Sequence, residues 1–299
     1  MSRLSNAGLE PVDVTPRPRS SPAGRVVRFL RTPWFNAVGI AIMAIVLAAA
    51  VVGPSLVARS PTDQDLKARL QPPSSEHPFG TDQFGRDLLS RVVAGTRISL
   101  LVAAVVLLVA VAAGVLLGGL AGLWGGWVDE AIMRVADLFL AFPALVLAAA
   151  IATTLGPRLT NTMLALSTVY WPWYARLVRA QILGLREKEY VLAAESLGAT
   201  RWWILIRHLL PNVFPIVLVQ ATIDVGYAIL STSTLSFLGL GAQPPTPEWG
   251  AMITAGRVFM QDSWWVATFP GLALAVTVLG FNLLGDGLRD WLDPRLRPV

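Results

Sequence analysis

Residues 186–211, REKEYVLAAESLGATRWWILIRHLLP, are the stretch of this chain that decides its fold. The stretch is too polar at its start to lie in a membrane and too apolar to be a free loop. Residues 186–197 are good helix formers, and Gly198 stands where a residue in the left-handed conformation would end that helix. Thr200 can cap a second helix that runs to Pro211, where we expect the chain to turn into the next segment. The stretch therefore predicts a short helix, a sharp glycine turn and a second helix.

Long apolar runs lie on both sides of this stretch. Of the 299 residues, 54% are hydrophobic and only 14% are charged, whereas a soluble domain carries about 25% charged residues. A helix needs about 20 mostly apolar residues to cross the hydrocarbon core of a bilayer. The runs predict an all-α membrane protein whose membrane domain covers residues 34–299. Six transmembrane helices are expected at about residues 34–58, 98–122, 131–155, 159–184, 212–236 and 263–287.

Lys and Arg set the expected orientation, because cytoplasmic loops carry an excess of them. Six spans place both chain ends on the same side of the membrane. That side, which includes the 186–211 stretch, carries about twice as many Lys and Arg residues as the other side, so we expect both termini in the cytoplasm. The formal net charge of +5 fits this asymmetry and does not indicate nucleic-acid binding. Residues 1–33 are rich in Pro, Ser and Arg, which predicts a disordered cytoplasmic tail.

Motifs of enzymes are missing from the sequence. There is no Gly-x-x-x-x-Gly-Lys-Ser/Thr loop for a nucleotide, no His-Glu-x-x-His helix for zinc and no Gly-x-Ser-x-Gly turn for a nucleophilic serine. The chain has no cysteine and only two histidines, His77 and His208. We therefore predict no catalytic residue, no metal site and no cofactor in this chain. Energy for any active process would come from a partner or from an ion gradient.

The first helix of the 186–211 stretch has a face of small and apolar residues. Small residues let another backbone approach closely, which favours a protein contact. The alternative is an amphipathic connector on the bilayer surface, with Trp202 and Trp203 in the aromatic belt. The residue pattern alone leaves both interpretations open. The face consists of Tyr190, Ala193, Ala194 and Leu197.

The string Ala193-Ala194-x-x-x-Gly198, followed by Leu210-Pro211, resembles the cytoplasmic signature loop of the permeases of ABC importers. The family signature begins Glu-Ala-Ala, and Leu192 replaces the Glu here, which removes any salt bridge from this position but keeps the helix–turn–helix shape. In the family, this loop docks into a groove of the ATPase subunit and transmits its closure. The resemblance therefore implies ATPase-coupling residues at Tyr190, Leu192, Ala193, Ala194, Gly198, Ala199, Leu210 and Pro211.

Three further strings resemble one branch of that family, the second permease subunit of dipeptide, oligopeptide and nickel importers. They are Gly-Thr-Asp-x-x-Gly-Arg-Asp-x-x-Ser-Arg at residues 80–91, the Gly- and Pro-rich string at residues 235–250 and the string at residues 285–295. From the residues alone, the first lies in an interfacial helix that leads into the second span. The second must bend, because three prolines forbid a regular helix. Since four strings agree in order and spacing, the chain is identified as a member of the ABC importer permeases.

Membership implies the type I ABC importer permease fold with a cytoplasmic coupling helix, in the plasma (inner) membrane of a bacterium. It implies a homologous second permease, two cytoplasmic ATPase subunits that bind ATP and Mg²⁺, and an extracellular substrate-binding protein. The expected function is import of dipeptides or oligopeptides by alternating access, with this chain forming half of the pathway. Nickel or another small ligand is the alternative cargo. A secondary transporter is less favoured, because no internal repeat is visible and the Gly198 turn would have no role in it.

Several polar residues interrupt the predicted spans. A carboxylate at the position of Asp224, near the centre of the fifth span, costs about 2.5–3.5 kcal/mol on insertion scales, so it should face protein or water. It either lies on the translocation pathway, where it could meet a peptide ammonium group or a cation, or it hydrogen-bonds to a neighbouring helix. Ser231 and Thr232 share these alternatives, and we favour the pathway for them. Arg134 and Asp137 lie one helical turn apart and are expected to pair with each other.

Overall fold

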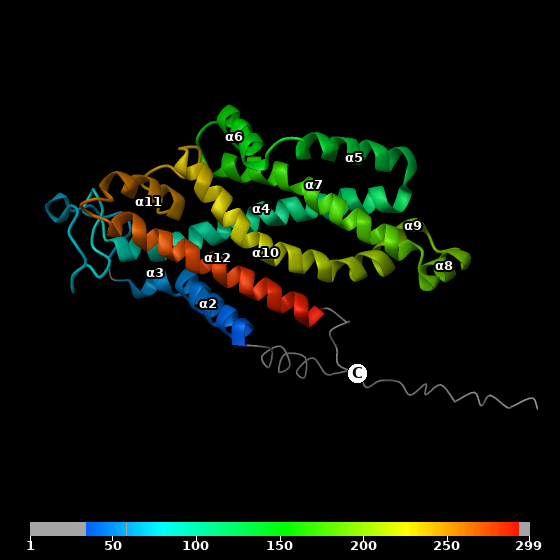
Figure 1. Cartoon of the computed structure of the whole chain (residues 1–299), viewed down its shortest axis with the longest axis horizontal. Helices are drawn as coiled ribbons and strands as arrows, with labels where there is room; N and C mark the ends of the chain where they lie inside the picture. Colours follow the sequence, from blue (N-terminus) through cyan, green and yellow to red (C-terminus); the bar gives the residue numbers. More distant parts are fainter. Residues whose placement is uncertain (1–33, 58, 293–299) are drawn as a thin grey trace, which may run out of the picture.

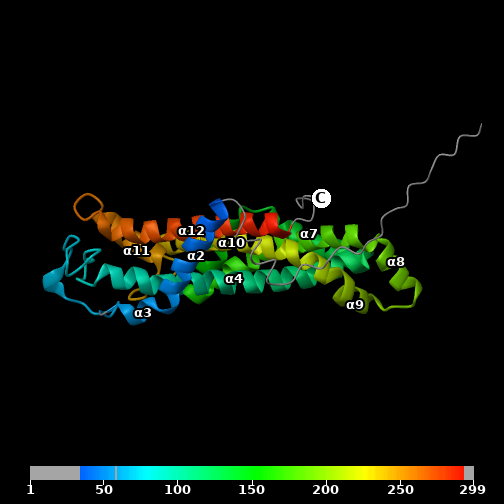
Figure 2. The same cartoon turned by 90° about the horizontal axis from the view of Figure 1, so that it is seen from below.

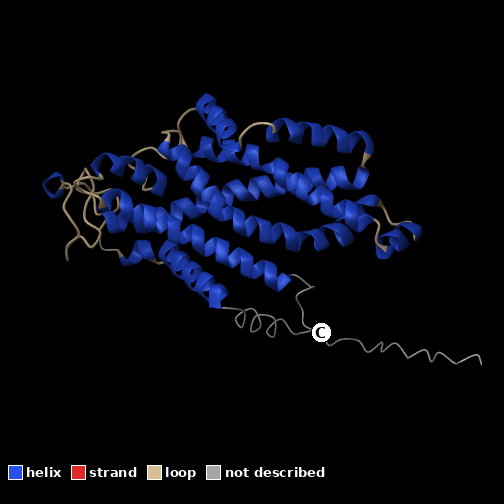
Figure 3. Cartoon of the chain, viewed as in Figure 1, coloured by secondary structure: helices blue, strands red, loops and turns tan. Residues whose placement is uncertain are grey.

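The computed structural model describes residues 34–57 and 59–292, and every regular element in these ranges is a helix (Figure 1, Figure 3). The predicted tail, residues 1–33, lies outside the described residues. The long helices run roughly along one axis (Figure 1, Figure 2), and α5 and α6 lie against α7. The long helices are α2 (Trp34–Val51), α4 (Leu88–Trp124), α7 (Leu159–Arg186), α10 (Leu210–Phe237) and α12 (Trp265–Leu292). The shorter elements are α3 (Gly53–Leu56), η1 (Leu66–Ala68), α5 (Gly126–Leu140), α6 (Ala144–Leu155), α8 (Glu189–Ser196), α9 (Arg201–Ile204), η2 (Leu205–Leu209), α11 (Trp249–Gly256) and η3 (Arg257–Phe259).

The predicted spans correspond in order to α2, α4, the α5–α6 pair, α7, α10 and α12. Within the described residues, three helices are long and apolar enough to cross a membrane: α4, the continuous helix Arg201–Phe237 and α12. The bent α5–α6 pair makes a fourth span if it is counted as one. The apolar helix Asn36–Val51 within α2 is shorter, and α7, with 28 residues, is long enough but more polar. The prediction of an all-helical membrane fold is confirmed.

The third predicted span, residues 131–155, is not a continuous helix. α5 ends at Leu140 and α6 begins at Ala144, and the two helices are bent by 89° relative to each other. Pro143 explains the break, because its ring disfavours a helical conformation of Phe142 and because it has no N–H to donate. The span expected at residues 131–155 is thus divided into two helices at this proline, and whether the pair crosses the membrane as one span stays a prediction.

The turn predicted at Pro211 is wrong. α9, η2 and α10 form one continuous helix, Arg201–Phe237, and η2 is a π-helical turn. Pro211 lies in the first turn of α10, directly after η2. A proline cannot make the usual bond to the carbonyl four residues before it, and a π-helical turn changes the hydrogen-bond register at that point. The chain therefore passes from the loop into the span without turning. The predicted lead-in helix and the second span are likewise one helix, α4.

Glycines make the contact between α4 and α7 close. A Cβ atom added at Gly118 would lie 2.9 Å from the Cα of Ala175 and 3.0 Å from its carbonyl carbon. One turn earlier, Gly114 faces Tyr174, and a Cβ there would overlap that side chain. Small residues spaced by four let membrane helices pack backbone to backbone. The α4–α7 pair is the densest contact of the bundle and fixes the position of the residues that α7 carries.

The two ends of the bundle carry different elements (Figure 1, Figure 2). The loop of residues 59–87 and α11 gather at one end, which we call the α11 end. α8 and α9 lie at the opposite end, which we call the α8 end.

Candidate functional site

The 186–211 stretch has the predicted helix–turn–helix shape at the α8 end. After α8, Gly198 has φ +83°, a left-handed conformation that favours glycine. The Thr200 hydroxyl oxygen then accepts a hydrogen bond from the backbone N–H of Trp203 at 3.3 Å and caps the next helix. Both local predictions, the glycine turn and the threonine cap, are confirmed.

Large apolar side chains of this loop are exposed among charged ones in the single chain. Leu197 is 89% exposed, and Leu192 and Tyr190 are also exposed, whereas Val191 is buried and holds α8 to the bundle. A Cβ at Gly198 would meet nothing within 4 Å. An exposed apolar surface of this kind is typical of an interaction site. Of the other predicted coupling residues, Ala193 and Pro211 are exposed, and Ala194, Ala199 and Leu210 are half-buried.

A cleft of about 360 Å³ lies between the α5–α6 bend, α7 and α10. The break at Pro143 contributes to it, because Leu140 and Ala144 on either side of the bend both line the cleft. The lining is largely aromatic and apolar, with a carboxylate and an amide on α10. The lining residues are Leu140, Ala144, Val169, Tyr170, Trp173, Tyr174, Gln220, Asp224 and Tyr227.

Both carboxylate oxygens of Asp224 accept hydrogen bonds. The Tyr174 hydroxyl donates to Oδ2 at 2.6 Å, and the Gln220 amide donates to Oδ1 at 3.0 Å. Tyr174 lies on α7, so the hydrogen bond to a neighbouring helix exists, and Asp224 lines the cleft as well. Within the described residues, no Lys or Arg forms an ion pair with Asp224, and no group of three or more His, Cys, Asp or Glu could hold a metal ion. The cleft therefore presents a carboxylate without a cationic partner.

Ser231 and Thr232 are both buried and do not line this cleft. The Tyr170 hydroxyl donates to Ser231 Oγ at 2.8 Å, which joins Ser231 to the cleft wall. Thr232 donates to the carbonyl oxygen of Ala228 in its own helix at 2.8 Å. A place on the translocation pathway stays a prediction for both residues.

Sequence reasoning missed Tyr170, Tyr174 and Gln220, which the structure brings to Asp224 and Ser231. Their spacing was the available signal, because Tyr170 with Tyr174 and Gln220 with Asp224 are i, i+4 pairs on one helix face each. The sequence contains no sign that these two faces meet. The contact between Tyr174 and Asp224 joins positions 50 residues apart.

Two ion pairs tie α5 to α7 towards the α8 end. Asp129 accepts two hydrogen bonds from Arg179, at 2.5 Å from Nε and 2.6 Å from Nη2. Asp137 pairs with Arg176, a residue 39 positions later. The predicted pair of Arg134 with Asp137 is wrong, because Arg134 instead pairs with an acidic residue of its own helix at 3.5 Å. Helix packing supplied a partner that local spacing could not indicate.

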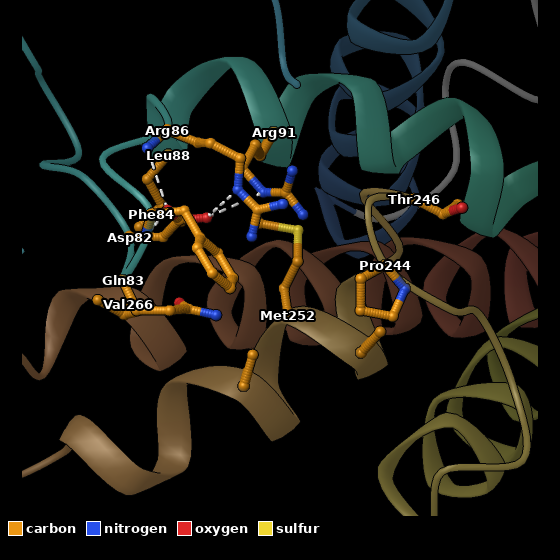
Figure 4. A pocket seen from close by; sticks show the side chains of 12 residues that line it. Asp82, Gln83, Phe84, Arg86, Leu88, Arg91, Pro244, Thr246, Met252 and Val266 are labelled. Carbon is orange, nitrogen blue, oxygen red and sulfur yellow. Dashed lines mark hydrogen bonds and ion pairs between the residues drawn. The ribbon is translucent and has the colours of Figure 1, made fainter. Parts of the chain in front are cut away.

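The Gly-Thr-Asp string before α4 forms a buried polar network at the α11 end (Figure 4). Asp82 Oδ2 lies 2.6 Å from Arg86 Nε and 3.5 Å from Arg91 Nε. Arg91 also donates to the carbonyl oxygens of Pro61 at 2.8 Å and Pro245 at 3.3 Å. The string thus joins the loop before α4 to the proline-rich turn after α10.

Asp87 of the same string caps α4. Its carboxylate accepts hydrogen bonds from the Ser90 amide at 2.9 Å and the Ser90 hydroxyl at 2.7 Å, and it lies 2.9 Å from His77 Nδ1. Burial raises the pKa of the Asp87 carboxyl, but hydrogen bonds from Ser90 and His77 lower it more, so the pKa lies below its ordinary value. The ionised carboxylate therefore stabilises the start of α4.

The proline-rich string after α10 is non-helical, as its prolines predicted. Buried Glu248 accepts hydrogen bonds from the backbone N–H groups of Gly250 and Ala251, both at 2.9 Å, and so caps α11. The indole N–H of Trp249 donates to the carbonyl oxygen of Val92 in α4 at 3.0 Å. The string therefore fastens α11 to α4.

Comparison with known proteins identifies the family. The family described as "Binding-protein-dependent transport system inner membrane component" matches residues 114–298. The probable D,D-dipeptide transport system permease protein of Escherichia coli K12 is 49% identical over 254 residues, which are 85% of each chain. A dipeptide transport system permease protein of Alkalihalophilus pseudofirmus is 42% identical over 295 residues, covering 95% of this chain and 97% of the relative. The nickel transport system permease protein of Escherichia coli K12 is 42% identical over 268 residues, covering 90% and 97%.

The matched region includes the α8 loop, the Asp224 cleft and both ion pairs between α5 and α7. The all-helical membrane fold agrees with the family match, and so does the 42% identity to a transport permease over 95% of this chain. A permease of this kind is a transport protein of the inner membrane and not an enzyme. The chain belongs to the inner-membrane components of binding-protein-dependent transport systems, the permease subunits of ABC importers.

Proposed function

We propose that this chain is one of two homologous permease subunits of an ATP-driven importer of dipeptides or oligopeptides. The observation that supports the peptide cargo is the identity, over 85–95% of the chain, to permeases named for D,D-dipeptide and dipeptide transport. The chain forms half of the translocation pathway, and the homologous permease forms the other half. Alternating access opens that pathway first to one side of the membrane and then to the other.

The α8 loop is the contact with the ATPase subunits in this proposal. Its exposed apolar residues Leu192 and Leu197 offer a docking surface, and buried Val191 links that surface to the bundle. Two cytoplasmic ATPase subunits bind ATP and Mg²⁺, and their closure pushes α8. The ion pairs between α7 and α5 transmit this movement from α7 to α5, whose end at Leu140 lines the cleft. This chain contributes no hydrolysis.

The α8 end faces the cytoplasm in this proposal, together with both termini. The excess of Lys and Arg in the segments assigned to that side supports the orientation. The α11 end then faces outward, where a substrate-binding protein delivers the cargo to the loop of residues 59–87 and α11.

The cleft at Asp224 lies on the pathway in this proposal. Its volume of about 360 Å³ falls within the range of about 300–1,000 Å³ that holds small ligands. The carboxylate, oriented by Tyr174 and Gln220, would meet the ammonium group of a passing peptide. The aromatic wall around it would contact the peptide side chains.

The test reconstitutes the complete importer, with both permeases, both ATPases and the binding protein, and measures ATP-dependent dipeptide uptake into proteoliposomes. We expect uptake in the wild type, and a loss of at least tenfold in Asp224→Asn with the complex still assembled. Asp262→Asn is the matched control, because Asp262 is exposed and lies outside the cleft, the loop of residues 59–87 and α11. If Asp224→Asn retained wild-type uptake and substrate-stimulated ATP hydrolysis, Asp224 would be a structural residue.

Nickel is the second candidate cargo, since the nickel permease of Escherichia coli K12 is 42% identical over 90% of this chain. Uptake measurements with the same proteoliposomes distinguish a peptide cargo from a nickel cargo. Uptake of radioactive Ni²⁺ without uptake of any dipeptide would overturn the peptide cargo and leave the permease role intact.

A further inference from the structure

The α11 end contains a small pocket that is separate from the cleft at Asp224 (Figure 4). Its volume is about 50 Å³, enough for a small polar group and too little for a peptide. Arg86, Arg91 and Asp82 form its polar wall, and Met252 closes its apolar side. Phe84, 39% exposed, lies at its rim.

This pocket has one more positive charge than negative charge. Arg86 is 4% exposed and Arg91 is 5% exposed, and Asp82 is the one acidic residue that lines the pocket. Asp82 Oδ2 is shared between the two guanidinium groups, and Oδ1 accepts from the backbone N–H groups of Phe84 and Arg86. Figure 4 shows the two guanidinium groups side by side, with the carboxylate on one flank.

The neighbouring acidic residues do not neutralise this charge. Asp87 is engaged with Ser90 and His77, and Glu248 with the start of α11 and with Ser233. Arg91 is otherwise held by neutral carbonyl oxygens, and the Nη atoms of Arg86 make no hydrogen bond within the described residues. A buried guanidinium without a full counter-charge is costly, so the site favours a further anion.

Gln83 is a further polar residue of this pocket. It lines the same pocket, and its side-chain oxygen is buried without a hydrogen-bond partner among the described residues. The groups that would hold an anion are the guanidinium groups of Arg86 and Arg91, which lie side by side. A carboxylate matches this arrangement, because a guanidinium binds its two oxygens in parallel.

We propose that this pocket receives the carboxylate of an acidic side chain of the substrate-binding protein. The inference rests on the proposed function, which places the α11 end outside the membrane and in contact with that protein. The rim residues Phe84 and Pro244 are exposed and accessible to a partner, and the centre of the Phe84 ring lies 4.7 Å from the guanidinium carbon of Arg86. A carboxylate on a projecting loop fits the volume of the pocket, supplies the missing charge and fixes the docking position.

The test measures binding of the purified binding protein of this transport system to the complete importer in nanodiscs. Gln83→Glu places a carboxylate inside the pocket and should weaken binding at least tenfold, with an equal or higher melting temperature. Thr246→Glu, from the opposite rim, should weaken binding similarly. Gln261→Glu adds the same charge at an exposed position outside the pocket, the loop of residues 59–87 and α11, and should bind as the wild type does.

Wild-type affinity in both Gln83→Glu and Thr246→Glu would overturn the assignment of the pocket. A loss seen only with peptide-loaded binding protein would assign the pocket to the carboxylate of the peptide and would also overturn the proposal. If the proposed function itself were wrong, the result would be distinguishable, because already the wild-type importer would neither bind the binding protein nor take up cargo.

Discussion

Gly118→Ala should destabilise the contact between α4 and α7. The new Cβ would lie 2.9 Å from the Cα of Ala175 and 3.0 Å from its carbonyl carbon, and backbone atoms cannot rotate away. Carbon atoms pack best at about 3.5–4.0 Å, and the carbonyl oxygen of Ala175 would be nearer still, so the two helices would have to separate by at least about 0.6–1.1 Å. Overpacking of this kind costs about 1–3 kcal/mol.

Gly271→Ala is the matched control for this substitution. Gly271 lies inside α12, and a Cβ there would meet nothing within 4 Å. Both substitutions gain about 1 kcal/mol of helix propensity, so this contribution cancels when the two variants are compared. The free energy of unfolding should therefore be about 1–3 kcal/mol lower for Gly118→Ala than for Gly271→Ala.

The assay unfolds the purified importer by adding SDS to a mild detergent and follows tryptophan fluorescence. Gly118→Ala should unfold at a lower SDS fraction than Gly271→Ala, and Gly271→Ala at the same fraction as the wild type or a higher one. Equal midpoints for the two variants would refute the reasoning, because the helices would then have separated at no cost.

Two further predictions concern the ends of the bundle. Gly198→Arg should leave the chain folded and in the membrane but lower ATPase co-purification or uptake at least tenfold. The side chain would point from a turn with φ +83° into the space where a partner docks, and normal uptake would contradict the docking surface. Burial raises the pKa of Asp87, but hydrogen bonds from Ser90 and His77 lower it more, so its pKa in the folded protein lies below the value of about 3.9 in the unfolded chain. The ionised carboxylate therefore stabilises the fold above about pH 3.9, and this contribution is lost as the pH falls through the pKa of the folded state. Between about pH 5 and pH 3 the melting temperature should fall more steeply in the wild type than in Asp87→Asn, and parallel curves would contradict the role of this carboxylate.

The sequence was a good guide wherever the deciding interaction was local. Gly198 adopts the left-handed conformation, and Thr200 caps the next helix, because both depend on residues within one turn. The sequence was misleading where a proline acted inside an apolar run. Pro143 breaks a predicted span, and Pro211 is accommodated by a π-helical turn where a bend was expected. Hydropathy reports the length of an apolar run but not the path of its backbone.

The candidate site shows the same difference between what local sequence predicts and what helix packing decides. Asp224 was recognisable as a functional candidate, because a carboxylate in an apolar span is costly wherever it faces. Its partner Tyr174 was not recognisable, since a tyrosine in a membrane helix is common and costs little. Asp137 had an apparent partner one turn away in Arg134, yet it pairs with Arg176 of another helix.

The sequence by itself determined that this chain is an all-helical membrane protein, and its signature strings placed it among importer permeases. Both conclusions follow from properties that each segment carries alone, namely its length, its hydrophobicity and its local turns. The tertiary structure decided which faces meet: Tyr174 with Asp224, Arg179 with Asp129, and Arg91 with the turn at Pro245. These contacts depend on how closely the helices pack, and the glycines of α4 set that distance only once α7 lies against them.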